Sequence, residues 1–141
     1  ARALRDARAP EAPAPLDLPG PTGESNRLHH TAREPLLCLG PGPEAARAQA
    51  EAVRALGGAA VEAQGDIRPE MLDQLAPLGG LLWWGDDATG LALDRALARR
   101  DGPIVPLIVV QPDSAHVLLE RHVCIDTTAA GGNAALLAAV S

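Results

Sequence analysis

The sequence predicts an α/β protein of the Rossmann-like class, in which helices cover both faces of an open parallel sheet. Between residues 36 and 110, short apolar runs alternate with longer stretches of helical pattern, and Gly or Pro separates most of them. The 141 residues include no Phe and no Tyr, so small aliphatic side chains must build the core. Strands that alternate with helices, joined by right-handed crossovers, give a parallel βαβαβαβ unit.

Each element follows from its apolar pattern and from the residues that end it. We expect strands at 36–39, 59–63, 81–84 and 104–110, and helices at 44–56, 69–78 and 88–100. The run 104–110 has no polar side chain, as is typical of a strand covered on both faces. Pro106 within it lacks an amide donor, which favours an edge position or a bulge. Two further short strands are expected at 117–119 and 123–125.

The two ends of the chain differ in character from its middle. Residues 1–35 hold five prolines between positions 10 and 21, which keep the backbone extended, so we expect a linker or arm after a short frayed helix at 2–8. Residues 36–125 are expected to form the Rossmann-like domain and residues 126–141 a C-terminal tail. The chain does not begin with Met, and we interpret it as a piece of a longer protein.

Composition narrows the classes of function. A net charge of −6 argues against a nucleic-acid surface and gives no reason to expect an anionic membrane as partner. The longest apolar runs, 104–110 and 134–140, are far shorter than the roughly 20 residues of a membrane helix. Cys38 and Cys124 lie in apolar runs and are expected to be small buried residues, without a metal or a disulfide, in a cytoplasmic protein. The histidines show no metal-ligand spacing.

A loose dinucleotide pattern follows the first expected strand. Gly40, Gly42 and Ala45 match G-x-G-x-x-A, and Glu62 lies about 20 residues further on, where an acid that binds ribose belongs. Against this, Pro41 and Pro43 each remove an N–H group that would bind phosphate, and Glu44 places a carboxylate there. We favour a tight turn and keep a nucleotide site as the alternative.

The third expected strand ends in two indoles and is followed by two carboxylates. Asp86 and Asp87 could bind Mg²⁺ or act as an acid–base pair, but a cap on the following helix is the commoner role of such a residue. Trp83 and Trp84 alternate across the strand, so one faces outward if only one side of the sheet is packed. We therefore expect no catalytic residue and no metal ligand in this chain.

Two motifs near the ends of the chain resemble segments of the proline utilization A family of bacterial flavoenzymes. The first, LPGPTGESN, resembles the segment that closes the aldehyde dehydrogenase module of that family, and its arm residues are Leu18, Pro19, Gly20, Pro21, Thr22, Gly23 and Glu24. The second, DTTAAGGN, resembles the family's C-terminal motif and comprises Asp126, Thr127, Thr128, Ala129, Ala130, Gly131, Gly132 and Asn133.

The resemblance implies a role for the piece and a chemistry for its parent. The parent would be a proline dehydrogenase joined to an L-glutamate γ-semialdehyde dehydrogenase, using FAD and NAD, cytoplasmic or peripheral to the inner membrane. This chain would be its non-catalytic domain of the aldehyde dehydrogenase superfamily, without a cofactor of its own. It would pack on the upstream dehydrogenase module and help to enclose the cavity that channels the intermediate. In isolation we expect the tail or the arm to pair with a second copy.

Overall fold

The computed structural model describes residues 1–11, 13–63 and 67–126. The chain forms two compact units, one made of Ala1–Ala12 and Ala32–Leu119 and the other of Pro13–Thr31 and Glu120–Ser141. We call them the parallel-sheet unit and the antiparallel unit. No helix in these described ranges has both the length and the apolar character needed to cross a bilayer. The division into arm, domain and tail made from the sequence stays a prediction.

The parallel-sheet unit confirms the predicted fold class. Its four strands are β3 (Leu36–Cys38), β4 (Ala60–Glu62), β5 (Gly80–Leu82) and β6 (Leu107–Ile108). They lie in the order β4-β3-β5-β6, and every pair of neighbours is parallel, with Leu37 opposite both Val61 and Leu81. Because the chain goes from β4 over to β5, on the far side of β3, the direction of winding reverses between β3 and β5. Ligand sites of open α/β sheets form at such a reversal, beyond the carboxyl ends of the strands.

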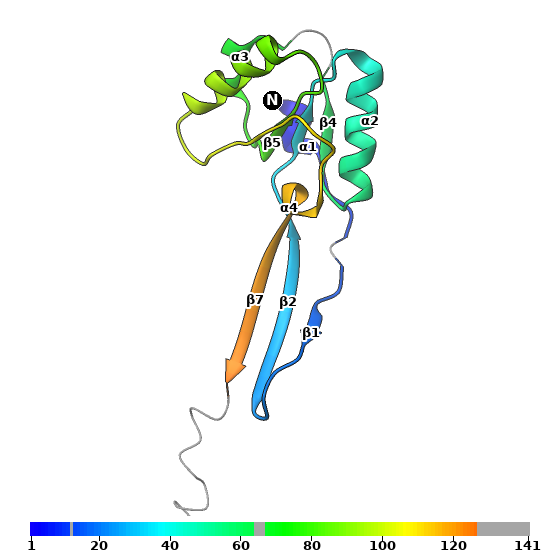
Figure 1. The fold of residues 1–141 in the computed structure, drawn as a ribbon, viewed down its shortest axis with the longest axis vertical. Helices are drawn as coiled ribbons and strands as arrows, with labels where there is room; N and C mark the ends of the chain where they lie inside the picture. Colours follow the sequence, from blue (N-terminus) through cyan, green and yellow to red (C-terminus); the bar gives the residue numbers. More distant parts are fainter. Residues whose placement is uncertain (12, 64–66, 127–141) are drawn as a thin grey trace, which may run out of the picture. The chain divides into compact units, whose positions relative to one another are not determined.

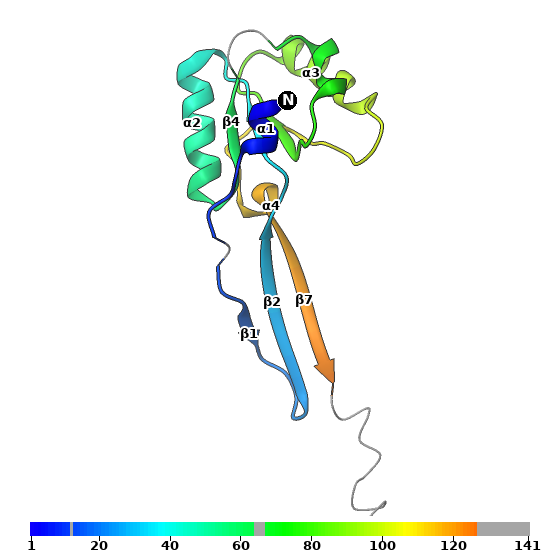
Figure 2. The same ribbon diagram turned by 180° about the vertical axis from the view of Figure 1, so that it is seen from behind.

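Helices cover both faces of this sheet (Figure 1). Helix α2 (Gly42–Ala55) has Ala46, Ala50 and Val53 at helical spacing and buries them on one face. The other face is covered by α3 (Asp87–Ala98), the 3-10 helix η1 (Pro69–Gln74) and α1 (Arg2–Asp6), whose Leu4 is buried in the same apolar cluster. Figure 2 shows α1 on this face, opposite to α2.

Two elements of this unit are shorter than predicted. The expected strand 104–110 is reduced to β6, at the edge of the sheet, and Ile104 is 97% exposed, so the prediction of a strand covered on both faces was wrong. Pro103 precedes the run and Pro106 interrupts it, and β6 has the edge position that Pro106 favours. The expected helix 69–78 is only the six residues of η1, because Pro77 cannot continue a helix.

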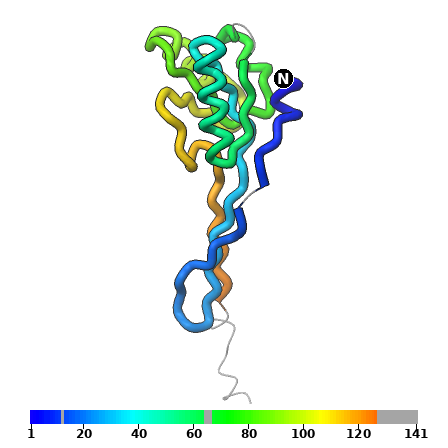
Figure 3. Tube along the Cα trace, turned by 90° about the vertical axis from the view of Figure 1, so that its right-hand side faces the viewer, coloured from blue at the N-terminus to red at the C-terminus, as the bar shows by residue number. Residues whose placement is uncertain are grey.

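The antiparallel unit contains strands that the sequence did not predict as a sheet. Its strands are β1 (Leu16–Leu18), β2 (Glu24–Ala32) and β7 (Leu118–Asp126), in the order β1-β2-β7. Leu18 is opposite Asn26 in the β1–β2 hairpin, whose connecting loop is drawn in blue in Figure 3. The expected strands 117–119 and 123–125 are parts of the single strand β7, except that Val117 is the last residue of a four-residue helix, α4 (Ser114–Val117).

Candidate functional site

The glycine turn after β3 is closed by hydrogen bonds within the protein. Gln49, fully buried on α2, accepts from the Gly40 N–H at 3.0 Å and donates through Nε2 to the Gly40 carbonyl at 2.9 Å. The same carbonyl accepts from the Trp84 N–H at 2.8 Å. Phosphate binding at such a turn depends on free N–H groups. Here the Gly40 donor is already used inside the protein.

The rest of the dinucleotide pattern has its own contacts. Gly40 and Gly42 have φ values of 102° and 78°, a conformation that glycine adopts readily, and Pro43 lies in the first turn of α2. A hollow of about 390 Å³ beside the turn is lined by both prolines, Gly42, Glu44 and Arg47. Glu62, at the end of β4, pairs with Arg54 at 3.3 Å. Ala45 is in the first turn of α2. The polar groups of Gly40 and Glu62 are therefore both bound by other residues of the chain, Gln49 and Arg54.

The two thiols have opposite surroundings. Cys38 is 0% exposed in the middle of the sheet, and this burial raises the pKa of its thiol to about 12, although the Arg54 charge acts the other way. A thiol of this kind is inert as a nucleophile at neutral pH. Cys124 was expected to be buried and is exposed, because it lies on β7, where most side chains are exposed. Its apolar neighbours in sequence gave the wrong prediction.

Asp86 acts as the cap of α3, as the sequence predicted. Its carboxylate accepts from the Thr89 N–H at 2.8 Å and from the Thr89 hydroxyl at 2.9 Å. These bonds stabilise the charged form and hold the pKa of Asp86 below its ordinary value. Among the described residues, no three His, Cys, Asp or Glu side chains lie close enough together to hold a metal ion.

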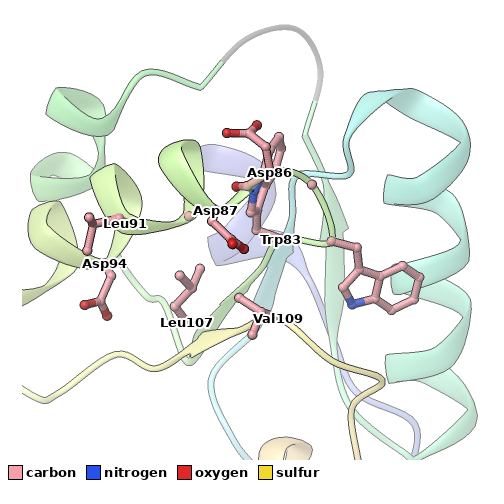
Figure 4. Close-up of a pocket in the computed structure, with 10 residues that line it drawn as sticks. Trp83, Asp86, Asp87, Leu91, Asp94, Leu107 and Val109 are labelled. Carbon is pink, nitrogen blue, oxygen red and sulfur yellow. Dashed lines mark hydrogen bonds between the residues drawn. The ribbon is translucent and has the colours of Figure 1, made fainter.

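A hollow of the parallel-sheet unit lies between α3 and β6, beyond the carboxyl end of β5. It has a volume of about 520 Å³, and its lining includes Trp83, Asp87, Leu91, Asp94, Leu107 and Val109 (Figure 4). The Trp83 indole donates to the Asp86 carbonyl at 2.9 Å and leaves no room for a Cβ on Gly85. Trp84 packs on the opposite apolar cluster and donates to the Val110 carbonyl at 3.0 Å. Both sides of the sheet are packed, so neither indole faces fully outward.

Of the two motifs that carry the resemblance, the structure describes the whole of the first and only one residue of the second. Thr127 to Asn133 lie outside the described residues, and Asp126 is the last residue of β7. The arm motif forms the β1–β2 hairpin, where Glu24 N–H donates to the Pro21 carbonyl at 3.1 Å and Gly23 has a φ of 94°. The hairpin's pairing beside β7 was missed from the sequence, because the polar residues of β2 gave no alternating apolar signal. His122 and Asn26 contact at 3.1 Å across these strands.

The sheet order and the covering helices define a Rossmann-like α/β domain. No protein-family model matches the chain. The chain is 32% identical over 143 residues to the bifunctional protein PutA of Escherichia coli (strain K12) and 29% identical to that of Salmonella typhimurium (strain LT2). Both alignments cover 85% of this chain and 11% of the relative, so the chain spans about a ninth of the relatives it matches.

Solved structures agree with this similarity. A crystal structure of a Bradyrhizobium japonicum Proline Utilization A (PutA) mutant matches with a TM-score of 0.55 and 27% identity. A crystal structure of a bifunctional proline utilization A (PutA) protein gives the same values. Each match covers 67% of this chain and 13% of the solved one. The chain is therefore homologous to a segment of the bifunctional PutA proteins.

Proposed function

We propose that this chain is a non-catalytic C-terminal domain of a bifunctional flavoenzyme that converts proline to glutamate. It packs on the L-glutamate γ-semialdehyde dehydrogenase module of the same polypeptide and helps to enclose the cavity through which the intermediate passes. The observation that supports this best is the similarity to PutA, which extends over 85% of the chain. FAD and NAD bind elsewhere in the parent.

The chemistry of the described residues supports a structural role. A Cys38 thiol whose pKa is raised to about 12 is not a nucleophile for an aldehyde at neutral pH. The turn at Gly40 uses its own polar groups, and Asp86 is engaged as a helix cap. The piece alone should therefore not oxidise glutamate semialdehyde with NAD⁺.

The alternative is a nucleotide-binding Rossmann domain. The observation in its favour is that Arg47 lines the hollow beside the glycine turn, where a phosphate would contact it. Calorimetric titration of the 141-residue chain with NAD⁺, NADP⁺ and ATP separates the two functions. Saturation in the micromolar range with any of them would favour the nucleotide function.

The main test uses the complete parent enzyme and two readouts: proline oxidation at the flavin and the coupled flux from proline to glutamate. Removal of residues 126–141 should lower the coupled flux and leave proline oxidation largely unchanged, because the flavin belongs to another module. Ile125→Arg should act in the same direction, since Ile125 is 56% exposed on β7 and its replacement costs no buried contact within this chain. Met71→Arg, at an exposed site on η1, is the matched control. Unchanged coupled flux in both test variants would contradict the proposal.

A further inference from the structure

Strand β6 leaves one side of the parallel sheet open. Among the residues that the structure describes, β6 pairs with β5 and has no strand on its other side. The Leu81 N–H donates to the Pro106 carbonyl at 3.0 Å, and the Trp83 N–H donates to the Ile108 carbonyl at 3.0 Å. The backbone groups of Pro106 and Ile108 therefore face β5. Because backbone groups of successive strand residues point to opposite sides, those of Leu107 and Val109 face the open edge. An open edge of this kind is a template for another extended chain.

Helix α3 runs beside this edge and makes it the floor of a groove. Leu91 and Asp94 come from the helix and Leu107 and Val109 from the strand segment, and all four line the same hollow (Figure 4). A second hollow of about 150 Å³ shares Asp94 and continues to Ile104. Leu91, Ile104 and Val109 are 51%, 97% and 56% exposed, so each hollow has an exposed apolar side chain in its lining; the smaller hollow is also lined by Arg100. We call it the α3–β6 groove.

The larger of the two hollows in the α3–β6 groove is negatively charged. Asp86, Asp87 and Asp94 contribute to its lining, and no basic residue does. The Asp86 carboxylate is used by Thr89. In the described part of the chain, the carboxylates of Asp87 and Asp94 take part in no hydrogen bond or ion pair. A cationic side chain that also brings apolar surface complements such a site.

We propose that the α3–β6 groove binds an extended segment of a partner protein that carries an arginine or lysine between apolar residues. The segment adds to the free edge of β6 through its main chain, as strand-adding peptides do. Its apolar side chains contact Leu91 and Val109, and its cation lies between Asp87 and Asp94. The inference does not rest on the proposed function, because every residue that carries it lies in the parallel-sheet unit and none belongs to the two terminal motifs.

The test uses the 141-residue chain and two synthetic peptides, one alternating valine with arginine and the other alternating valine with glutamate. Tryptophan fluorescence follows binding, since Trp83 lines the groove. Amide hydrogen exchange locates it. We expect saturable binding of the arginine peptide only, with new protection at the amides of Leu107 and Val109 and no change at Ile108, which already faces β5.

Two variants and a control test the residues involved. Asp94→Asn should weaken binding about threefold, as is typical for one solvent-accessible ion pair, and the double variant Asp87→Asn/Asp94→Asn about tenfold. Glu51→Gln, at an exposed site on α2, should leave binding unchanged. Equal binding of the two peptides, equal binding of free arginine amide, or an unchanged double variant would overturn the proposal. Protection of Leu107 and Val109 that appears without peptide and disappears on dilution would also overturn it, since the occupant would then be a second copy.

Discussion

Gly58 follows the end of α2 and lies against Val53 of that helix and Val117 of α4. A Cβ on this residue would lie 2.8 Å from the Val117 Cβ and 2.9 Å from a Val53 methyl group. Gly58→Ala should therefore lower the free energy of unfolding by about 1–3 kcal/mol, as overpacking of a core does. Urea unfolding measures the change. Gly90→Ala on α3 is the control, because its Cβ would meet Trp83 at an ordinary 3.5 Å and a helical Ala should stabilise. Equal stability of the two variants would contradict this account.

The buried thiol of Cys38 makes stability depend on alkaline pH. The pKa of Cys38 is raised from 9.0 to about 12 in the folded chain, so above about pH 9 the unfolded state loses a proton that the folded state keeps. Stability should therefore be complete below that pH and fall as the pH rises towards 12, by up to about 1.4 kcal/mol per unit. The sequence has no Tyr and no Lys, so few other groups titrate in this window.

The measurement compares urea unfolding at about pH 8 and about pH 10.5. Cys38→Ala should remove most of the difference between the two conditions, even if the variant is less stable at both. Cys124→Ala should retain the difference, because Cys124 is exposed. A pH dependence that survives in Cys38→Ala would have to come from another group and would contradict the assignment.

At the scale of elements, the sequence predicts what local pattern determines. The alternation of apolar runs with Ala-rich stretches gives β3, α2, β4, β5 and α3 within a few residues of their observed bounds. The errors arise where tertiary context decides. Residues 104–110 are apolar enough for a central strand, yet two prolines restrict pairing to Leu107–Ile108. Strand β2 is polar along most of its length, and only its long-range pairing makes it a strand. In β7, Glu120, Arg121 and His122 separate two apolar runs that the sequence predicts as two short strands.

In the candidate site, too, the sequence predicts the features that depend on local pattern and misses those that depend on tertiary contacts. The cap at Asp86 could be predicted because it depends on residues three apart along the chain. The bond between Gln49 and Gly40 joins a helix face to a turn, and nothing in the local pattern marks Gln49 as the buried partner. The groove between α3 and β6 combines Leu91 with Val109, which come together only when the sheet order is known.

The glycine turn leads to a prediction for the element as a whole. Gln49→Leu removes the acceptor of the Gly40 N–H and should lower the free energy of unfolding by about 1–3 kcal/mol, because a buried donor loses its partner. Glu51→Gln on the exposed side of α2 is the control for stability.

The glycine turn also leads to a prediction for nucleotide binding. Calorimetry on the unchanged chain should give an NAD⁺ dissociation constant no tighter than millimolar, since Pro41 and Pro43 have no N–H. A micromolar constant would contradict the closed turn.

At the scale of the whole molecule, the two units differ in how they bury apolar surface. The parallel-sheet unit has helices on both faces and fully buried strands such as β3 and β5. In the antiparallel unit, all three residues of β1 are exposed and β7 is exposed over most of its length. A sheet covered by helices on both faces holds its hydrogen bonds more firmly than a sheet with little buried apolar surface. The proposed packing on a dehydrogenase module would give the second sheet the cover that it lacks here.

This difference gives a prediction that compares the chain with its parent. In the 141-residue chain, amides of β2 and β7 should exchange with solvent faster than those of β3 and β5, because Leu16, Leu18 and Ile125 are 54%, 38% and 56% exposed and stabilise the sheet little. In the complete parent, docking should slow exchange in β2 and β7, and alkylation of Cys124 should slow with it. Hydrogen exchange and thiol labelling measure both, and the buried Cys38 is the internal reference that reacts in neither protein. If β7 exchanges and Cys124 reacts at the same rates in the chain and in the parent, the antiparallel sheet is not the surface through which the domain packs.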